Sequence, residues 1–179
     1  MKDVVIRRID AAHEEDIRIP NEPFELFGRL IPCYDGKIWS HTEELFAEPS
    51  AMCFPDENYQ MVDMSDCIFL GAYRDGICAG LAVLQKSWNK YLYVYDLKVS
   101  RSLRGKGVGG MLMNGAEEIA KELGYRGLWV VAQDNNLAAC RFYLKQGFAI
   151  GGLDTQVYHG TSQQGKADVH FYRENRAAT

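Results

Sequence analysis

A run of glycines and basic residues, RSLRGKGVGG from Arg101 to Gly110, carries the clearest chemical signal in the sequence. Where such a run enters a helix, the first backbone N–H groups have no partner within the helix and point outward at the positive end of the helix dipole. That arrangement binds anions, and two basic side chains add full charges to it. The run therefore predicts a pyrophosphate site, although a flexible surface turn would have a similar composition. The predicted site consists of Arg104, Gly105, Lys106, Gly107, Val108, Gly109 and Gly110.

Two other phosphate-binding patterns compete with this interpretation. A P-loop ends in Gly-Lys-Ser/Thr, whereas Gly110 is followed by Met-Leu, so a P-loop is excluded. Gly105, Gly107 and Gly110 do have the G-x-G-x-x-G spacing of dinucleotide-binding folds, and Asp134 lies about where the ribose partner is expected. After Asp134, however, the chain has room for one more helix but not for a doubly wound sheet, which disfavours a dinucleotide site.

The residues around the run predict a strand, a loop and a helix. Residues 91–100 alternate at period two and are rich in aromatic and β-branched side chains, which is typical of a strand. From Met111 onward, apolar residues recur every three or four positions until Leu123, and Gly124 then marks the end of an amphipathic helix. A buried strand and a second helix, capped at its first residue by an asparagine and ended by a glycine, are predicted at residues 127–133 and 136–147.

The rest of the chain predicts mainly antiparallel strands. All five prolines lie before residue 56, so the helices expected at residues 24–31 and 38–46 must be short. The acidic residues 56–66 predict a connector that is mobile or solvated, and the Asp75-Gly76 pair predicts a tight hairpin turn. Strands are expected at residues 4–9, 67–73, 77–88, 148–158 and 167–172. Residues 13–16 predict the acidic start of a short helix, and residues 176–179 predict a frayed tail.

Length and composition narrow the class of protein. We expect one domain over residues 1–179, made of a cleft-forming part (1–66), a core (67–158) and a last strand with a tail (159–179). The net charge of -4 disfavours nucleic acid as a partner and suits a cationic substrate. The five cysteines and four histidines lack the spacing of a disulfide framework or a metal site, so no metal is expected. Without a leader or a long apolar run, the expected location is the cytoplasm, with no membrane partner.

Two motifs resemble the GNAT superfamily of N-acetyltransferases. Arg104, Gly107 and Gly109 match its pyrophosphate pattern Arg/Gln-x-x-Gly-x-Gly/Ala. The second motif begins at Asn136 and continues through Ala139, Phe142-Tyr143 and Gly147-Phe148. The resemblance implies an α/β (α+β) fold, in which a mixed, mostly antiparallel sheet holds a central βαβ unit at an acyl-CoA site. It also implies acetyl-CoA as the co-substrate.

The same resemblance implies roles for residues outside the glycine run. In the superfamily, the asparagine of the second motif contacts pantetheine, the tyrosine faces the thioester sulfur, and backbone N–H groups of a splayed strand polarise the acetyl carbonyl. Carried over to this sequence, these cofactor contacts are Leu97, Lys98, Val99, Asn135, Asn136 and Tyr143.

Longer phrases are similar to the streptothricin acetyltransferases, a family within that superfamily. They include Glu22-Pro-Phe-Glu25, Trp88-Asn89, Gln133-Asp-Asn-Asn-Leu137 and Asp154-Thr155. This similarity implies acetylation of an amine on the β-lysine arm of streptothricin, a cationic antibiotic, and hence antibiotic resistance. The expected substrate contacts are Glu22, Glu25, Trp88, Tyr95 and Asp154.

The chemistry needs a group that removes a proton from the substrate. An ordinary amine with a pKa of about 10.4 is almost entirely ammonium at neutral pH, and deprotonating it costs roughly 4 kcal/mol. Asp96 is the candidate general base, although it could instead hydrogen-bond a neighbouring backbone group at a strand bulge. Tyr93 or Tyr95 could carry a water relay in its place. Tyr143 is the candidate acid for the departing thiolate.

Two rival functions remain open at this stage. One is acetylation of a different amine, such as an aminoglycoside, a polyamine or a protein lysine. The other is an acyl-CoA-binding module without catalytic activity. The sequence does not fix the oligomeric state, and a homodimer is one of the options.

Overall fold

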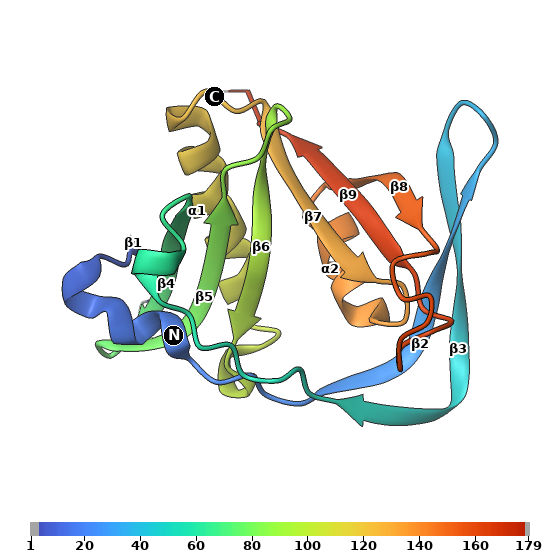
Figure 1. Ribbon diagram of the computed structural model, residues 1–179, viewed down its shortest axis with the longest axis horizontal. Coiled ribbons are helices and arrows are strands. Elements are labelled where there is room, and N and C mark those ends of the chain that lie inside the picture. The colour runs from blue at the N-terminus through green and yellow to red at the C-terminus, as the bar shows by residue number, and fades with distance from the viewer. Residues whose placement is uncertain (1–3, 178–179) are drawn as a thin grey trace. The chain divides into compact units, whose positions relative to one another are not determined.

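The computed structural model describes residues 4–177 and divides into two compact units (Figure 1). The first unit combines the described parts of Met1–Glu22, Cys53–Leu128 and Asn175–Thr179, and the second combines Pro23–Met52 with Trp129–Glu174. Each unit is therefore built from segments that are far apart in the sequence. This division does not follow the boundaries expected at residues 66 and 158, and the prediction of a single domain stays a prediction.

The first unit contains an antiparallel sheet that leads into the glycine run. Its strands lie in the order β1-β4-β5-β6, and the predicted hairpin at Asp75-Gly76 joins two of them. Asp75 and Gly76 have φ angles of 52° and 82°, as expected for a two-residue turn that fits the twist of the strands. The strands are β1 (Val5–Arg8), β4 (Cys67–Arg74), β5 (Ile77–Gln85) and β6 (Tyr91–Val99).

A β-bulge interrupts the pairing of β6 with β5. Val94 lies opposite Leu84 and Asp96 lies opposite Val83, so Tyr95 is an extra residue on β6. Because side chains alternate between the two faces of a strand, one extra residue moves every following side chain to the other face. The bulge thus turns Asp96 and, two residues later, Lys98 toward the face that carries Val83.

The two faces of this sheet are covered by different elements. On one face, helix α1 (Val108–Glu122) packs against the sheet, and a Cβ atom added to Gly80 would lie 3.3 Å from Leu112 (Figure 1). The helix begins three residues before the predicted Met111, and Gly124 follows its end with a φ of 74°. The other face carries a hydrophobic group that we call the Tyr59 cluster, formed by Ile9, Ile17, Tyr59, Phe69, Tyr73, Leu81 and Val83.

The segment of residues 53–66, which precedes β4, is more ordered around Tyr59 than the sequence suggests. The prediction of a mobile or solvated connector is wrong at Tyr59, which is only 6% exposed and packs in the Tyr59 cluster. An aromatic ring that covers apolar strand residues is stabilised by the surface it buries. This segment contains the short 3-10 helix η2 (Met61–Asp63). Two other 3-10 helices are η1 (Ala11–Arg18), which follows β1, and η3 (Arg101–Leu103), which follows β6.

The second unit holds a long hairpin where helices had been predicted. Residues 24–31 and 38–46 lie in the antiparallel strands β2 (Phe24–Tyr34) and β3 (Trp39–Met52), so that prediction is wrong. The register between the two strands shifts at Leu26/Gly28. A Cβ atom on Gly28 would lie 2.8 Å from Leu137, which shows how closely β2 approaches the helix of this unit.

The remaining elements of the second unit follow the predicted order. The strands lie in the order β7-β9-β8, with β7 contributing its residues from Trp129 onward. They are β7 (Gly127–Gln133), β8 (Ala149–Asp154) and β9 (Asp168–Glu174), and the helix is α2 (Leu137–Lys145). Strand β8 ends four residues before the predicted end at residue 158. Of the predicted tail, residues 178–179 lie outside the described residues, whereas Arg176 forms an ion pair with the buried Glu117.

Candidate active site

The glycine run forms an open turn at the start of α1. Gly105 and Gly107 have φ angles of 73° and 85°, which favour glycine, and an added Cβ atom on either would have no neighbour within 4 Å. The helix begins at Val108, so the N–H groups of its first turn have no partner inside the helix. Open space beside these donors, at the positive end of a helix of 15 residues, fits a phosphate group.

Arg104 is held in place by the strand and by a residue from the N-terminal segment. Its Nε donates to the carbonyl oxygen of Val99 at 2.9 Å, and its Nη2 donates to the carbonyl oxygen of Glu22 at 3.2 Å. The Glu22 carboxylate lies 3.6 Å from the same guanidinium and accepts a hydrogen bond from the N–H of Arg101. Glu22, predicted to contact the substrate, therefore supports the turn that carries the predicted phosphate ligands. Lys106 donates from Nζ to the carbonyl oxygen of Ser102 at 2.7 Å.

Asp96 lies in a group of polar side chains, which we call the Asp96 network and which consists of Glu57, Tyr59, Asp96 and Lys98. The Tyr59 hydroxyl donates to Asp96 Oδ2 at 3.0 Å, and Lys98 Nζ lies 3.3 Å from the same oxygen. Lys98 Nζ also donates to Glu57 Oε2 at 2.7 Å. The hydrogen bonds of Asp96 thus go to side chains, and not to a backbone group at the bulge.

Burial shapes the protonation of this network. Burial raises the pKa of the Asp96 carboxyl above its ordinary value, and the Lys98 ammonium acts against that shift. Burial also raises the pKa of the Tyr59 hydroxyl, and the negative charge of Asp96 adds to the effect. Tyr59 therefore remains a hydrogen-bond donor at any physiological pH, while Asp96 exchanges its proton nearer neutrality than an exposed aspartate does.

Tyr95 lies at the bulge, next to Asp96 in the sequence. Its side chain is 46% exposed, and its ring lies edge-on to those of Tyr59 and Tyr93, at 6.3 and 6.0 Å between centroids. An exposed aromatic ring beside a partly buried carboxylate can contact the apolar part of an amine substrate. The structure thus brings Tyr95, Asp96 and Lys98 together, and Leu97 and Val99 lie on the same half of β6.

In the second unit, the second motif forms the start of α2. Asn136 caps this helix, as predicted, because its Oδ1 accepts from the N–H of Ala139 at 3.2 Å. Asn135 is 6% exposed, and its Oδ1 has no hydrogen-bond partner among the described residues. A buried amide oxygen without a partner is costly, so a ligand that donates to it would be favoured. The ring of Tyr143 packs against Phe148 and Phe171.

Two of the predicted substrate contacts in this unit serve local structure or face solvent. Asp154 Oδ1 accepts from the N–H groups of Gln156 and Val157 at 2.8 and 3.1 Å, so its carboxylate stabilises the turn after β8. Glu25 lies exposed on β2, opposite Ala51. Both remain predictions as substrate contacts.

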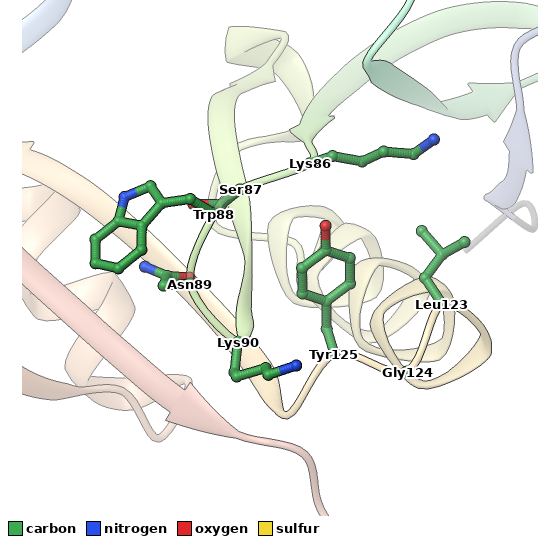
Figure 2. A pocket seen from close by; sticks show the side chains of 8 residues that line it. All are labelled: Lys86, Ser87, Trp88, Asn89, Lys90, Leu123, Gly124 and Tyr125. Carbon is green, nitrogen blue, oxygen red and sulfur yellow. The ribbon is translucent and has the colours of Figure 1, made fainter.

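Trp88 lies at the end of β6 that is remote from the glycine run. The turn between β5 and β6 borders a pocket of about 330 Å³, and Figure 2 shows the Trp88 indole pointing away from Tyr125. Trp88 is 96% exposed, so its ring fills no part of the protein interior. As a substrate contact it also stays a prediction. The pocket is lined by Lys86, Ser87, Trp88, Asn89, Lys90, Leu123, Gly124 and Tyr125.

Tyr59 and Glu57 were missed as site residues in the sequence. Both lie in the acidic segment that was interpreted as a connector, and only the structure shows that they contact β6. One signal was present, because Tyr59 is the only aromatic residue between Pro55 and Asp66. A single large apolar ring in a polar segment commonly marks the point where that segment packs on a core.

Two further features of residues 4–177 bear on metal binding and on membrane insertion. No group of three or more His, Cys, Asp or Glu side chains within residues 4–177 is arranged to hold a metal ion. In the same range, no helix has the length and apolar character needed to cross a membrane.

Known proteins match this chain over most of its length. The family model described as Acetyltransferase (GNAT) family matches residues 36–148. Streptothricin acetyltransferase A of Bacillus subtilis (strain 168) is 33% identical over 171 residues, which cover 94% of this chain and 98% of that protein. A crystal structure assigned as a streptothricin acetyltransferase from Bacillus anthracis str. Ames, in complex with acetyl coenzyme A, is 28% identical, with a TM-score of 0.85 over 96% of this chain and 98% of that one. Nourseothricin acetyltransferase, also solved as a crystal structure, is 30% identical, with a TM-score of 0.80 over 97% of this chain and 99% of that one.

Proposed function

Since the chain belongs to the GNAT family of acetyltransferases, we propose that it transfers the acetyl group of acetyl-CoA to an amine of the β-lysine arm of streptothricin and so inactivates the antibiotic. The enzyme is an N-acetyltransferase with the mixed, mostly antiparallel GNAT fold, and acetyl-CoA is its co-substrate. The proposal includes a small-molecule amine as the partner and a cytoplasmic location, where acetyl-CoA is available.

One observation carries the choice of substrate. The similarity to streptothricin acetyltransferase A of Bacillus subtilis extends over 171 residues, beyond the 36–148 that the general family model matches. It therefore includes segments that a shared acetyl-CoA site alone does not require. The net charge of -4 is compatible with a polycationic substrate.

The glycine run and α1 supply the proposed contacts for the phosphates of acetyl-CoA. The backbone N–H groups at Val108, Gly109 and Gly110 give directed donors, and Arg104 adds a charge whose orientation is fixed by its bond to Val99. Asn135, whose amide oxygen has no partner within residues 4–177, is suited to accept from an amide N–H of the pantetheine chain.

The transfer step needs a base and gains from an acid. Asp96 removes a proton from the substrate ammonium, which frees the nitrogen lone pair. The nitrogen then bonds to the carbonyl carbon of the thioester as the carbon–sulfur bond breaks, and the thiolate departs with the electron pair. The new amide nitrogen loses its second proton to water. Tyr143 donates its hydroxyl proton to that thiolate. With ordinary pKa values of about 10 and 8.5, this last transfer is uphill by about 2 kcal/mol, so the contribution of Tyr143 is modest.

Thiol release with purified enzyme tests the proposal. Acetyl-CoA is supplied at saturation, and the free thiol is measured with streptothricin, an aminoglycoside, a polyamine and a lysine peptide as acceptors. We expect kcat/KM for streptothricin to exceed that for every other acceptor by at least about 100-fold, since a site matched to one substrate rejects analogues that leave its polar groups unpaired. A higher value for another amine would overturn the choice of substrate, and no release with any amine would overturn the proposed transfer reaction.

A further inference from the structure

The Asp96 network joins strand β6 to the segment that precedes β4. Glu57 and Tyr59 come from that segment, and Asp96 and Lys98 come from β6 after the bulge. Tyr59 is anchored by its ring in the Tyr59 cluster, which leaves its hydroxyl at a fixed position over β6. Two contacts, the hydrogen bond from the Tyr59 hydroxyl to the Asp96 carboxylate and the ion pair between Lys98 and Glu57, thus connect the same two pieces of chain.

Both donors of the network use the same oxygen of Asp96. Tyr59 and Lys98 each approach Oδ2, and no residue within 4–177 donates to Oδ1. Although Oδ1 has no such donor, it is not fully buried, so it retains access to solvent. One oxygen is therefore occupied and oriented, and the other can accept a proton from outside the network.

The charges of the network do not cancel. Lys98 contributes one positive charge, and Glu57 and Asp96 contribute two negative charges when ionised, which leaves one negative charge in excess. Lys98 is buried, with 8% of its surface exposed, so these charges interact strongly. An ammonium group that approaches Oδ1 would balance the excess charge, whereas an anion would be repelled.

We propose that Tyr59 and the Glu57–Lys98 ion pair position the Asp96 carboxylate so that Oδ1 is the atom that receives the proton of the substrate ammonium. This proposal rests on the proposed acetyl transfer to an amine. Tyr59, Glu57 and Lys98 are positioning residues, since they act through Asp96 and need not touch the acceptor. A carboxylate that two donors hold in place keeps its working orientation during the reaction better than one that rotates freely.

The network predicts opposite pH effects for two substitutions. The titratable groups that face Asp96 are Tyr59, Glu57 and Lys98, with Tyr95 adjacent on the bulge. The Tyr59 hydrogen bond stabilises the charged carboxylate, so its removal raises the pKa of Asp96. The negative charge of Glu57 destabilises the same carboxylate, so its removal lowers that pKa.

Kinetics as a function of pH provide the first test. The acidic limb of kcat/KM for the acceptor amine is measured for wild type, Tyr59→Phe and Glu57→Gln, with the amine that the wild type acetylates best. We expect Tyr59→Phe to shift this limb to higher pH by about one unit and to lower kcat/KM about tenfold at pH 7. Glu57→Gln should shift the limb to lower pH by about half a unit. KM for acetyl-CoA should change less than twofold.

Tyr73→Phe is the matched control. Tyr73 belongs to the same Tyr59 cluster, and its hydroxyl also donates to a carboxylate, that of Asp16 at 2.5 Å. This substitution therefore removes an equivalent bond without touching Asp96. It should lower Tm by an amount similar to Tyr59→Phe and leave the pH profile unchanged. If Tyr59→Phe lowers Tm but leaves the pH profile of kcat/KM unchanged, as expected for Tyr73→Phe, the role of Tyr59 is structural and the proposal is wrong.

A titration that needs no substrate separates this proposal from the proposed function. The Asp96 carboxyl carbon is followed by ¹³C NMR against pH in the wild type, Tyr59→Phe and Glu57→Gln. Shifts of its midpoint in opposite directions support the network whatever amine the enzyme acetylates, and unchanged midpoints overturn it. Failure of streptothricin in the thiol-release assay, by contrast, concerns the proposed function alone.

Discussion

The candidate reactive residues of the first unit are oriented by side chains from several segments of the chain. Arg104 is held by Glu22, and Asp96 is held by Tyr59 and Lys98. Glu22 comes from the N-terminal segment, Tyr59 comes from the segment before β4, and Lys98 comes from β6 itself. Since a catalytic group must stay within a few tenths of an ångström of its working position, such supports are expected to affect rate as much as the reactive groups themselves do.

The first residue-level prediction concerns Tyr143. Tyr143→Phe keeps the ring that packs on Phe148 and Phe171 and removes only the hydroxyl. We expect kcat to fall by about 10- to 100-fold, because the thiolate loses its proton donor. The free energy of unfolding, measured by urea denaturation, should fall by at most about 1.5 kcal/mol. An unchanged kcat would mean that the thiolate leaves without help from this tyrosine.

The second residue-level prediction concerns Glu22, which the sequence had suggested as a substrate contact. Its carboxylate lies beside Arg104 and accepts from the N–H of Arg101, so Glu22→Gln should loosen the glycine run and raise KM for acetyl-CoA about three- to tenfold. KM for streptothricin should change less. Glu25→Gln is the control, because Glu25 lies exposed on β2. This substitution should leave KM for acetyl-CoA unchanged. A Glu22→Gln enzyme with a raised KM for streptothricin alone would return Glu22 to the role of a substrate contact.

At the level of elements, the strand, the loop and the helix around the glycine run could be predicted because each has a local signal. Period-two alternation marked β6, glycines marked the turn, and three-and-four spacing marked α1. The hairpin of β2 and β3 could not be predicted in this way. Phe24, Phe27 and Leu30 recur at the spacing of a helix, and the pairing that makes this segment a strand is with residues more than ten positions away. Long-range pairing of this kind overrides local preference.

The Asp96 network escaped prediction for a related reason. Its members are separated by about forty positions in the sequence, and the bulge at Tyr95 decides which face Asp96 occupies. The alternation of β6 without the bulge would place Asp96 on the opposite face. Asp96 itself was correctly placed on this strand, but its role as a base stays a prediction.

The element-level prediction concerns the two glycines at the ends of α1. Gly107 and Gly124 have φ angles of 85° and 74°, and an added Cβ atom meets nothing within 4 Å at either position. Alanine at either site should therefore lower the free energy of unfolding by a similar amount, about 1 kcal/mol, through backbone strain. Only Gly107→Ala places a methyl group beside the N–H groups at the helix start, so only this variant should raise KM for acetyl-CoA, by about tenfold. Equal KM values for the two variants would contradict the phosphate site.

For the whole molecule, the two units divide the predicted roles between them. The first unit contains the glycine run and the Asp96 network, and the second contains Asn135, Asn136 and Tyr143. Segments that are remote in the sequence contribute to each unit, which explains why no single motif contained all the candidate residues. The homodimer stays a prediction, as do the single domain and the contributions of Glu25, Trp88, Tyr95 and Asp154 to substrate binding.

The central claim is that one amine of streptothricin receives the acetyl group, and the structure of the reaction product tests it most directly. The wild-type enzyme is incubated with acetyl-CoA labelled with ¹³C at the acetyl carbonyl and with streptothricin, and the product is examined by mass spectrometry and by proton–carbon correlation NMR. We predict a single added acetyl group, with the labelled carbonyl coupled to the amide proton of an amine on the β-lysine arm. A product acetylated elsewhere on streptothricin, or no labelled product, would contradict the claim.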